Sequence, residues 1–215
     1  MYTYERKVTY SEVACDGLAD EAQIVRYFQD CSTMQSESLG MGIDYLEQHS
    51  NVWMLTAWQI RFMRRPGLGE DIVTGTWAYD FDAMYGYRNF ILKSAEGETL
   101  AVANSIWVLI NTHTGRPEKL TMEAVEGYGS EEKYPRRIKL PKDWMLKEPF
   151  TVKRADLDTN CHVNNARYIS MALEYIEPQM KIRQIRVEYK KAAVQGDTIC
   201  PKVNRGENRT TVALC

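Results

Sequence analysis

Histidine is scarce in this chain, with three among 215 residues, and the five cysteines include no CxxC pair. Neither residue type shows the close spacing of a zinc site or of a disulfide framework, so we expect reduced thiols and no metal. A glycine-rich phosphate-binding loop is missing as well. The sequence therefore gives no reason to expect a metal or an organic cofactor.

Long apolar runs and a strong net charge are also lacking. No run approaches the roughly 18 apolar residues of a membrane-spanning helix, and the start, "MYTYERKVTY", has no hydrophobic signal region. The formal net charge of −2 attracts neither nucleic acid nor an anionic membrane. We therefore expect a cytoplasmic globular protein with no membrane span and no nucleic-acid partner.

The first half of the chain predicts one long helix followed by antiparallel strands. Asp20 and Gln23 form a capping-box-like start, apolar residues then recur at helical spacing, and Gly40 marks the end. Alternation of apolar residues predicts four strands after the helix, and one strand precedes it. This pattern indicates an α+β unit in which an antiparallel sheet wraps a long helix. The expected strands cover residues 4–10, 51–63, 71–82, 85–94 and 99–111.

This unit is expected to occur twice. The segment "WQIRFMRRPGLGEDIVTGTW" (58–77) resembles "RQIRVEYKKAAVQGDTICPKV" (183–203), and each copy follows a strand and a helix. In the second copy that strand and helix are expected at 148–154 and 165–176. Nothing after "TTVALC" matches strand 99–111, so the second copy either lacks its last strand or is cut short of it. The expected boundaries are an N-terminal unit at 1–125, a linker at 126–146 and a C-terminal unit at 147–215.

The stretch "RADLDTNCHVNNARYISMALEYI" (154–176) concentrates chemically active side chains. If its first nine residues are extended, Asp158, Asn160 and His162 lie on one face. Cys161 then lies on the other face as a packed small hydrophobe. A trio of this kind suits proton transfer to and from a water molecule. The alternative is that these residues only cap a helix and satisfy a turn.

The same stretch supplies hydrogen-bond donors for an oxyanion. Asn164 or Asn165 can cap the following helix and leave free backbone N–H groups beside His162. The amides expected there are those of Val163, Asn164 and Asn165. Hydrolysis of an acyl group needs such donors for its tetrahedral intermediate.

This stretch resembles the signature of the hotdog-fold acyl-acyl-carrier-protein thioesterases of plants and bacteria. That signature runs Arg, two residues, Leu-Asp-x-Asn-x-His-Val-Asn-Asn, then Tyr-Ile and Leu-Glu, and the segment "VEYKKAAVQGDTI" (187–199) is similar to the strand that follows. The resemblance implies a tandem, or double, hotdog and hydrolysis of fatty acyl-carrier-protein thioesters to free fatty acids. It also implies that Asp158, Asn160 and His162 are active-site residues and that the first hotdog holds the acyl chain.

One departure from the family pattern concerns the nucleophile. Ala192 and Ala193 stand where many plant members have Glu-Cys, so no thiol is available there and water is the expected nucleophile. Asp158 and His162 would activate this water, directly or through one another, and Asn160 would orient them. Which of the two takes the proton is left open.

Substrate contacts are expected in two places. Met54 and Trp58, on the strand at 51–63, are expected to be core residues first and acyl-pocket liners second. An acyl carrier protein is acidic, so the basic segments "RFMRR" and "KYPRRIKLPK" are expected to dock it. The predicted docking residues are Arg64, Arg65, Arg136, Arg137, Lys139 and Lys142.

Three alternatives stay open for a chain of this fold. It could hydrolyse acyl-CoA instead, act as a dehydratase, or bind acyl groups without catalysis. A dehydratase is expected to carry an acid on the long helix, where Glu21, Asp30 and Glu37 form no clear motif. The sequence also leaves open whether the protein is a monomer or a homodimer.

Overall fold

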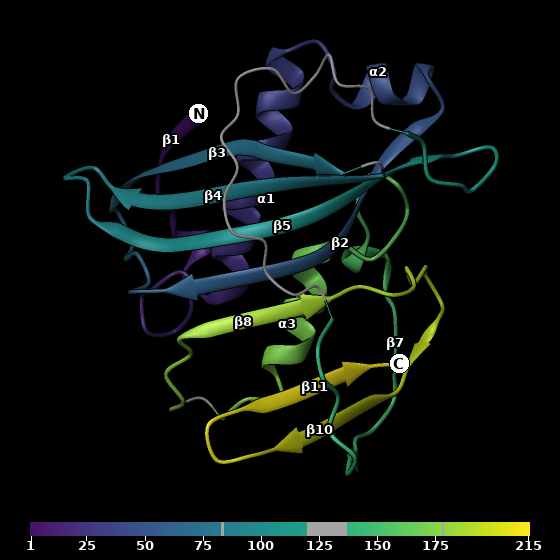
Figure 1. Cartoon of the computed structure of the whole chain (residues 1–215). Helices are drawn as coiled ribbons and strands as arrows, with labels where there is room; N and C mark the ends of the chain where they lie inside the picture. The colour runs from purple at the N-terminus through teal and green to yellow at the C-terminus, as the bar shows by residue number, and fades with distance from the viewer. Residues whose placement is uncertain (83, 120–136, 178) are drawn as a thin grey trace. The chain divides into compact units, whose positions relative to one another are not determined.

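The computed structural model describes residues 1–82, 84–119, 137–177 and 179–215 (Figure 1). Contacts between residues divide the chain into two compact units. The first comprises Met1–Arg136 and Ile182–Glu188, and the second comprises Arg137–Lys181 and Tyr189–Cys215. Within the described ranges, no helix is long and apolar enough to cross a membrane.

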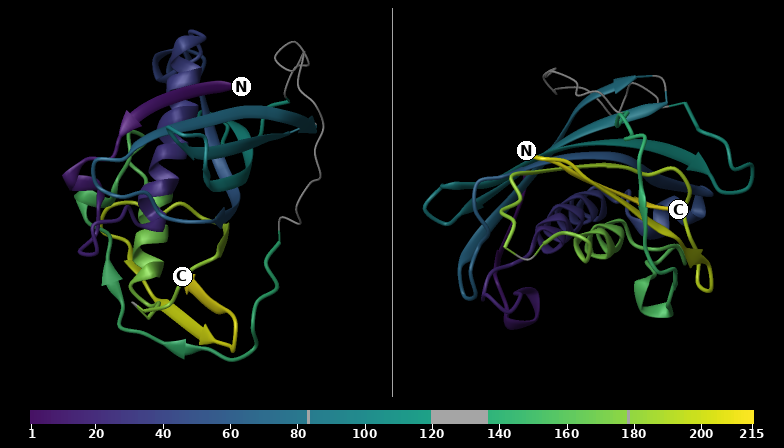
Figure 2. Two further views of the ribbon diagram at one scale, coloured as in Figure 1. Left: turned by 90° about the vertical axis from the view of Figure 1, so that its left-hand side faces the viewer. Right: turned by 90° about the horizontal axis from the view of Figure 1, so that it is seen from below.

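The first unit is a long helix lying along one face of an antiparallel sheet (Figure 2). The sheet has six strands in the order β1-β3-β4-β5-β2-β8. Helix α1 packs against β1, β3 and β4. The elements of this unit are β1 (Tyr2–Lys7), the 3-10 helix η1 (Tyr10–Glu12), α1 (Glu21–Ser38), α2 (Ile43–Gln48), β2 (Asn51–Phe62), β3 (Asp71–Asp82), β4 (Tyr85–Ser94), β5 (Thr99–Asn111) and β8 (Gln184–Glu188).

Helix α1 confirms the prediction of a long capped helix. The Asp20 carboxylate accepts a hydrogen bond of 2.6 Å from the backbone N–H of Gln23, which satisfies one of the free amides of the first turn. The apolar face of α1 is buried, and Phe28 packs against the rings of Trp58 and Phe90, with centroids 6.1 and 5.2 Å away. This aromatic cluster joins the helix to β2 and β4 and forms the centre of the core.

The two repeated Gln-Ile-Arg segments pair with each other. Strands β2 and β8 are antiparallel, and Ile60 lies opposite Ile185. On either side of this pair, Gln59 lies opposite Arg186 and Arg61 lies opposite Gln184. Strand β8, which the sequence places in the C-terminal stretch 147–215, therefore completes the sheet of the first unit.

The second unit is smaller and has shorter strands. It contains a three-stranded sheet, β11-β10-β6, and a two-stranded sheet, β7-β9. Helix α3 ends at Leu173, three residues before the predicted end, and the strand expected at 148–154 is reduced to two residues. The elements are β6 (Met145–Leu146), β7 (Phe150–Thr151), η3 (Arg154–Asp156), α3 (Asn165–Leu173), β9 (Thr198–Ile199), β10 (Pro201–Arg205) and β11 (Thr210–Leu214).

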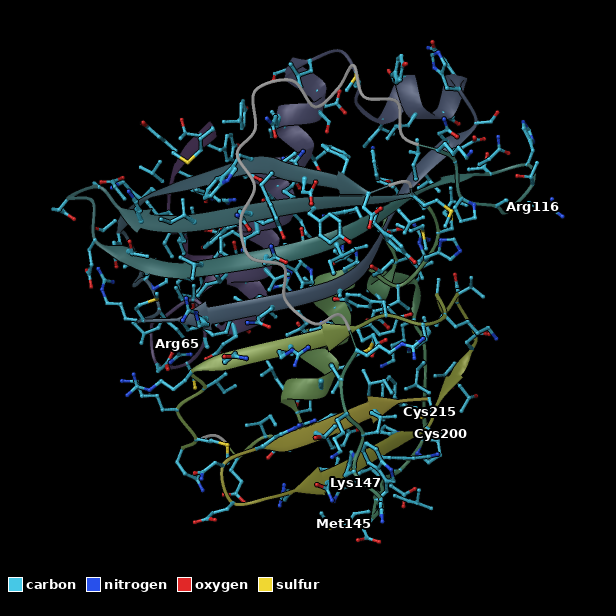
Figure 3. The ribbon with its side chains drawn as sticks, in the orientation of Figure 1. Arg65, Arg116, Met145, Lys147, Cys200 and Cys215 are labelled. Atoms are coloured by element: carbon cyan, nitrogen blue, oxygen red, sulfur yellow. The ribbon has the colours of Figure 1, made fainter. Side chains whose placement is uncertain are left out.

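A small apolar core holds the second unit together. Val163, Met171 and Ile199 are buried in one cluster with Val152 and Ala193. Burial of such side chains stabilises the unit by roughly 1.5–3 kcal/mol each. At the edge of this unit, Cys200 and Cys215 extend the β10–β11 ladder by exchanging backbone hydrogen bonds, and both thiols are exposed and free (Figure 3).

Candidate active site

Residues 158 to 162 form a tight turn, named here the 158–162 turn. The N–H of Asp158 donates to the carbonyl oxygen of His162 over 2.7 Å, and the N–H of Cys161 donates to the carbonyl oxygen of Asp158 over 3.1 Å. Leu157 and Val163 pair across the base of the turn. The expectation of an extended segment with two faces is therefore wrong, because these local hydrogen bonds fold the chain back on itself.

Cys161 occupies a special position in this turn. Its φ of 59° lies in the left-handed region, which is costly for a residue with a side chain. Its thiol is exposed. The expectation that Cys161 is a packed small hydrophobe is therefore wrong, since the turn directs this residue to the surface.

The turn brings Asp158, Asn160 and His162 together through the backbone. One carboxylate oxygen of Asp158 accepts hydrogen bonds from the N–H of Asn160 at 2.8 Å and from the N–H of His162 at 3.3 Å. Asp158 and His162 are half-buried, and Asn160 is exposed. The His162 imidazole and the Asn160 amide bind no other side chain among the described residues, so both stay open to a water or a substrate.

The start of α3 lies directly after the turn. Asn164 caps the helix, as predicted, because its side-chain oxygen accepts from the N–H of Ala166 at 2.9 Å. The N–H of Val163 donates to Ala193 and the N–H of Asn164 donates to Asp156, each to a carbonyl oxygen at 2.9 Å. Two of the three amides expected to face an oxyanion are therefore occupied. Within the described chain, the third, of Asn165, has no such partner.

Asp156 is a site residue that the sequence reasoning missed. It is 5% exposed, and its carboxylate accepts from the N–H of Lys153 at 2.8 Å and from Nε of Arg167 at 2.7 Å. Burial alone would raise the pKa of this carboxyl, but the hydrogen bonds and the charge of Arg167 hold its pKa below the ordinary value. Asp156 thus ties the turn to α3. Asp156 is part of the segment 154–176, but the sequence does not reveal that its carboxylate binds Arg167, 11 residues later on α3.

Two tyrosines fix the strand segment beside the turn. His162 pairs with Val194. The N–H of Ala193 donates to the hydroxyl oxygen of Tyr168 over 2.8 Å, and the hydroxyl of Tyr189 donates to the carbonyl oxygen of Asn165 over 2.9 Å. Ala193, one of the two alanines that stand where many plant members have Glu-Cys, therefore contributes its backbone N–H and carbonyl oxygen to the site.

The first unit contains the same turn at residues 14 to 18, named here the 14–18 turn. The N–H of Ala14 donates to the carbonyl oxygen of Leu18, and the N–H of Gly17 donates to the carbonyl oxygen of Ala14, both over 2.9 Å. Gly17 has a φ of 76°, as Cys161 has a positive φ in the other turn. The two turns are thus built by the same backbone hydrogen bonds.

The polar groups that support the two turns are also shared. In each unit, a buried or half-buried acid caps the preceding 3-10 helix, an Asp or Asn caps the following long helix, and an acid accepts from a backbone N–H in the neighbouring strand segment. These matched pairs are Glu12 and Asp156, Asp20 and Asn164, and Glu70 and Asp197. The match supports duplication of one structural unit.

The side chains on the two turns differ. The 14–18 turn carries alanine, aspartate and leucine where the 158–162 turn carries aspartate, asparagine and histidine. In the first turn the carboxylate is at the third position, where Asp16 accepts the N–H of Leu18 at 3.1 Å. The turn therefore forms without an imidazole at its last position and without a carboxylate at its first. The corresponding pairs are Ala14 and Asp158, Asp16 and Asn160, and Leu18 and His162.

The two predicted acyl-pocket residues lie in different surroundings. Trp58 is 2% exposed and packs against Phe28 and Phe90, so its first role is in the core. Met54 is half-buried on β2, where it lies opposite Val108 of β5. Of the two, Met54 is the residue whose side chain can change without opening the aromatic cluster.

The predicted docking residues also divide into two groups. Arg64 forms ion pairs with Glu70 at 2.8 Å and with Glu98 at 2.6 Å. Arg65, which is labelled in Figure 3, forms an ion pair with Asp16. The positive charges of these two arginines are therefore compensated within the first unit. Residues Arg137, Lys139 and Lys142 are exposed. Arg136 lies outside the described residues.

Comparison with known proteins identifies the chain's family. Residues 1–128 match the model of the acyl-ACP thioesterase N-terminal domain, and residues 140–213 match that of the C-terminal domain. Oleoyl-acyl carrier protein thioesterase 1 of Arabidopsis thaliana is 26% identical over 87% of this chain. Palmitoyl-acyl carrier protein thioesterase of Cuphea hookeriana is 23% identical over 84% of it. The matches span 59% and 49% of these relatives, so the chain covers only part of their length.

Solved structures match over nearly the whole chain. A putative oleoyl thioesterase from Lactobacillus plantarum superposes with a TM-score of 0.86, at 24% identity, over 99% of this chain and 90% of that one. The 12:0-ACP thioesterase from Umbellularia californica gives 0.82, at 18% identity, over 100% and 93%. These likenesses confirm the α+β tandem hotdog fold. Together with the family models that span both halves, they show that this chain belongs to the acyl-ACP thioesterase family.

Proposed function

We propose that the chain hydrolyses the thioester of a fatty acyl-acyl-carrier protein and releases the free fatty acid. The observation that carries this proposal is the repeated turn. Two units share its backbone and its supporting acids, but only the second turn presents Asp158, Asn160 and His162. Membership of the acyl-ACP thioesterase family supports the same reaction.

Water is the nucleophile in this proposal. Asp158 and His162 together take a proton from the water as its oxygen attacks the thioester carbonyl carbon, and Asn160 holds the water in line. The carbon–sulfur bond then breaks, and the proton taken up by Asp158 and His162 passes to the departing thiolate. The products are a fatty acid and the thiol of the carrier, so one water is consumed for each bond broken.

The start of α3 stabilises the intermediate. The tetrahedral intermediate carries its negative charge on the former carbonyl oxygen, and the N–H of Asn165 in the first turn of α3 is the amide best placed to bind it. The positive end of the helix dipole favours the same charge. Cys161 takes no part in this mechanism, because this residue is exposed in the 158–162 turn and the nucleophile is water.

The first unit has a binding role in this proposal. Its 14–18 turn has no counterpart of the Asp158 carboxylate or the His162 imidazole, whereas its sheet and helix form the larger apolar interior. We assign the fatty-acyl chain to this unit, with Met54 among the side chains that set the chain length. Trp58 supports that pocket from within the core.

The carrier protein docks on the exposed basic residues before β6. Arg137, Lys139 and Lys142 are exposed, and an acidic carrier would be repelled by the net charge of −2 unless it met a concentrated positive surface. Arg64 and Arg65 contribute less, because acids of the first unit already neutralise them.

Thiol release from matched acyl thioesters tests this function. The same acyl chains are presented on acyl carrier protein and on coenzyme A, and the rates are compared. Faster hydrolysis of the carrier-protein thioesters is expected. Preference for the coenzyme A thioesters would make the chain an acyl-CoA thioesterase, and hydrolysis of neither panel would overturn the proposal in favour of a dehydratase or an acyl-binding module.

A further inference from the structure

The backbone that follows His162 offers too few free hydrogen-bond donors for an oxyanion. Oxyanion holes commonly combine two or more hydrogen-bond donors, and losing one typically costs about 100-fold to 1000-fold in rate. Of the three backbone amides after His162, those of Val163 and Asn164 are occupied by carbonyl oxygens. The N–H of Asn165 alone would leave the intermediate with a single donor from this loop.

The hydroxyl group of Tyr168 is a second donor at this place. Its oxygen accepts the N–H of Ala193 at 2.8 Å, and no group in the described chain accepts its own proton. Tyr168 lies three residues after Asn165, so both residues are on one face of α3, and a helical side chain leans back toward the N-terminus of its helix. Tyr168 is half-buried, and this geometry directs its side chain toward the end of α3 that carries the open amide.

A rigid frame holds this hydroxyl in place. Ala193, which donates to it, also accepts the N–H of Val163 through its carbonyl oxygen at 2.9 Å. The Tyr168 ring packs against the Tyr189 ring, with centroids 5.9 Å apart. Two hydrogen bonds thus connect the Tyr168 hydroxyl to the residue that follows His162.

The first unit supplies an internal comparison. Ile24 and Tyr168 occupy the same helix position, because each donates its backbone N–H to the carbonyl oxygen of the capping residue, Asp20 or Asn164. Ile24 is fully buried and apolar. The unit without the Asp158 and His162 side chains therefore also lacks the hydroxyl, as expected for a group that serves the chemistry and not the fold.

We propose that Tyr168 is a catalytic residue that completes the oxyanion hole, donating its hydroxyl hydrogen bond to the thioester oxygen together with the N–H of Asn165. This inference rests on the proposed thioester hydrolysis and deepens it. The hydroxyl stays protonated while it acts. Burial and the negative charges of Asp197 and Asp158 raise the pKa of Tyr168, against the opposing effect of the Ala193 N–H.

The test compares Tyr168→Phe with Tyr189→Phe. Both variants remove one hydroxyl from the same ring pair, and each loses one hydrogen bond to the backbone. For Tyr168→Phe we expect kcat to fall by about 100-fold with KM nearly unchanged, because the donor acts on charge that develops in the transition state. For Tyr189→Phe we expect kcat within a few-fold of wild type. Thermal unfolding of both variants measures the structural loss.

The outcomes of these assays separate the possibilities. A fall in kcat for Tyr168→Phe alone, with similar shifts in unfolding temperature for both variants, supports the inference. Equal, small losses of kcat in the two variants would overturn it and leave Tyr168 a purely structural residue. His162→Leu is assayed in parallel. If it retains activity, the proposed function of the 158–162 turn fails; if it is inactive while Tyr168→Phe is not, only the oxyanion assignment fails.

Discussion

Leu18 and His162 occupy the same position of two turns that share their backbone hydrogen bonds. Leu18 pairs with Gly67 in the first unit as His162 pairs with Val194 in the second. A chain segment that accepts leucine at this position has no structural need for an imidazole there. The imidazole of His162 is therefore available for the proposed proton transfer.

Cys161 should be replaceable by glycine with a gain in stability. Gly17 occupies the same position with a φ of 76°, and Cys161 has a φ of 59°. The left-handed conformation costs a residue with a side chain roughly 1–2 kcal/mol, and glycine avoids this cost. Glycine loses more conformational entropy on folding, which reduces the gain in stability by roughly 0.5–1 kcal/mol. We expect Cys161→Gly to raise the free energy of unfolding by about 0.5–1 kcal/mol and Cys161→Ala to leave it nearly unchanged.

Hydrolysis is the second readout for these two variants. Both should retain most of the wild-type rate, because the proposed nucleophile is water. A large loss of activity in Cys161→Ala, with intact unfolding, would mean that the thiol takes part in the reaction.

Asp156 should make the protein less stable in acid. The pKa of Asp156 is lower in the folded chain than in the unfolded one, so the unfolded state binds the proton more readily. The stabilisation from this group is fully present above roughly pH 5 and is lost as the pH falls through its folded pKa. Asp156→Asn should therefore lower stability at neutral pH and flatten its fall below roughly pH 4. Parallel slopes of unfolding free energy against pH for the two proteins would refute this.

Much of the first unit could be predicted from sequence, because its strands are long and alternate clearly. The stretches at 71–82, 85–94 and 99–111 coincide with β3, β4 and β5. The cap at Asp20 also fixed the start of α1. In these strands, the residues that alternate as apolar in the sequence are largely the ones that the folded chain buries.

The site was harder to predict, because its geometry depends on contacts that the local pattern does not reveal. A five-residue turn with Cys161 in the left-handed region replaces the extended segment, although cysteine is not a usual residue for that conformation. The amides of Val163 and Asn164 are occupied by carbonyl oxygens of Ala193 and Asp156. One of these acceptors, Ala193, lies about 30 residues after Val163 in the sequence. No local sequence pattern shows that two segments so far apart come into contact.

Met54 should set the preferred acyl-chain length. A larger side chain, in Met54→Trp, should shift hydrolysis toward shorter chains, and Met54→Ala should shift it toward longer ones, with kcat on the best substrate little changed. One methylene in an apolar pocket is worth about 1–3 kcal/mol, so the shift should appear as a change in rank across a chain-length panel. Identical profiles for wild type and both variants would place the pocket elsewhere. Trp58→Ala is a poor probe, since loss of this core ring costs about 3–5 kcal/mol.

Carrier-protein docking should depend on Lys139 and Lys142. Reversal of both charges to glutamate should raise KM for an acyl-carrier-protein substrate several-fold and weaken its dependence on salt, because complementary charge mainly speeds the encounter. Hydrolysis of a small acyl thioester should not change. Arg116→Glu is the matched control, since Arg116 is an exposed cation in a different loop (Figure 3). An equal effect of the control, or equal losses on both substrates, would exclude a local docking site.

The rate of thiol release from an acyl-carrier-protein thioester, measured for wild type and for the variants Asp158→Ala and His162→Leu, tests the central claim most directly. These substitutions place alanine and leucine, the residues at positions 14 and 18, into the 158–162 turn, which has the same backbone hydrogen bonds as the 14–18 turn. We predict that each variant unfolds cooperatively near the wild-type temperature and hydrolyses at least about 100-fold more slowly, as expected when a proton-transferring group is removed. Rates within a few-fold of wild type in either folded variant would contradict the account.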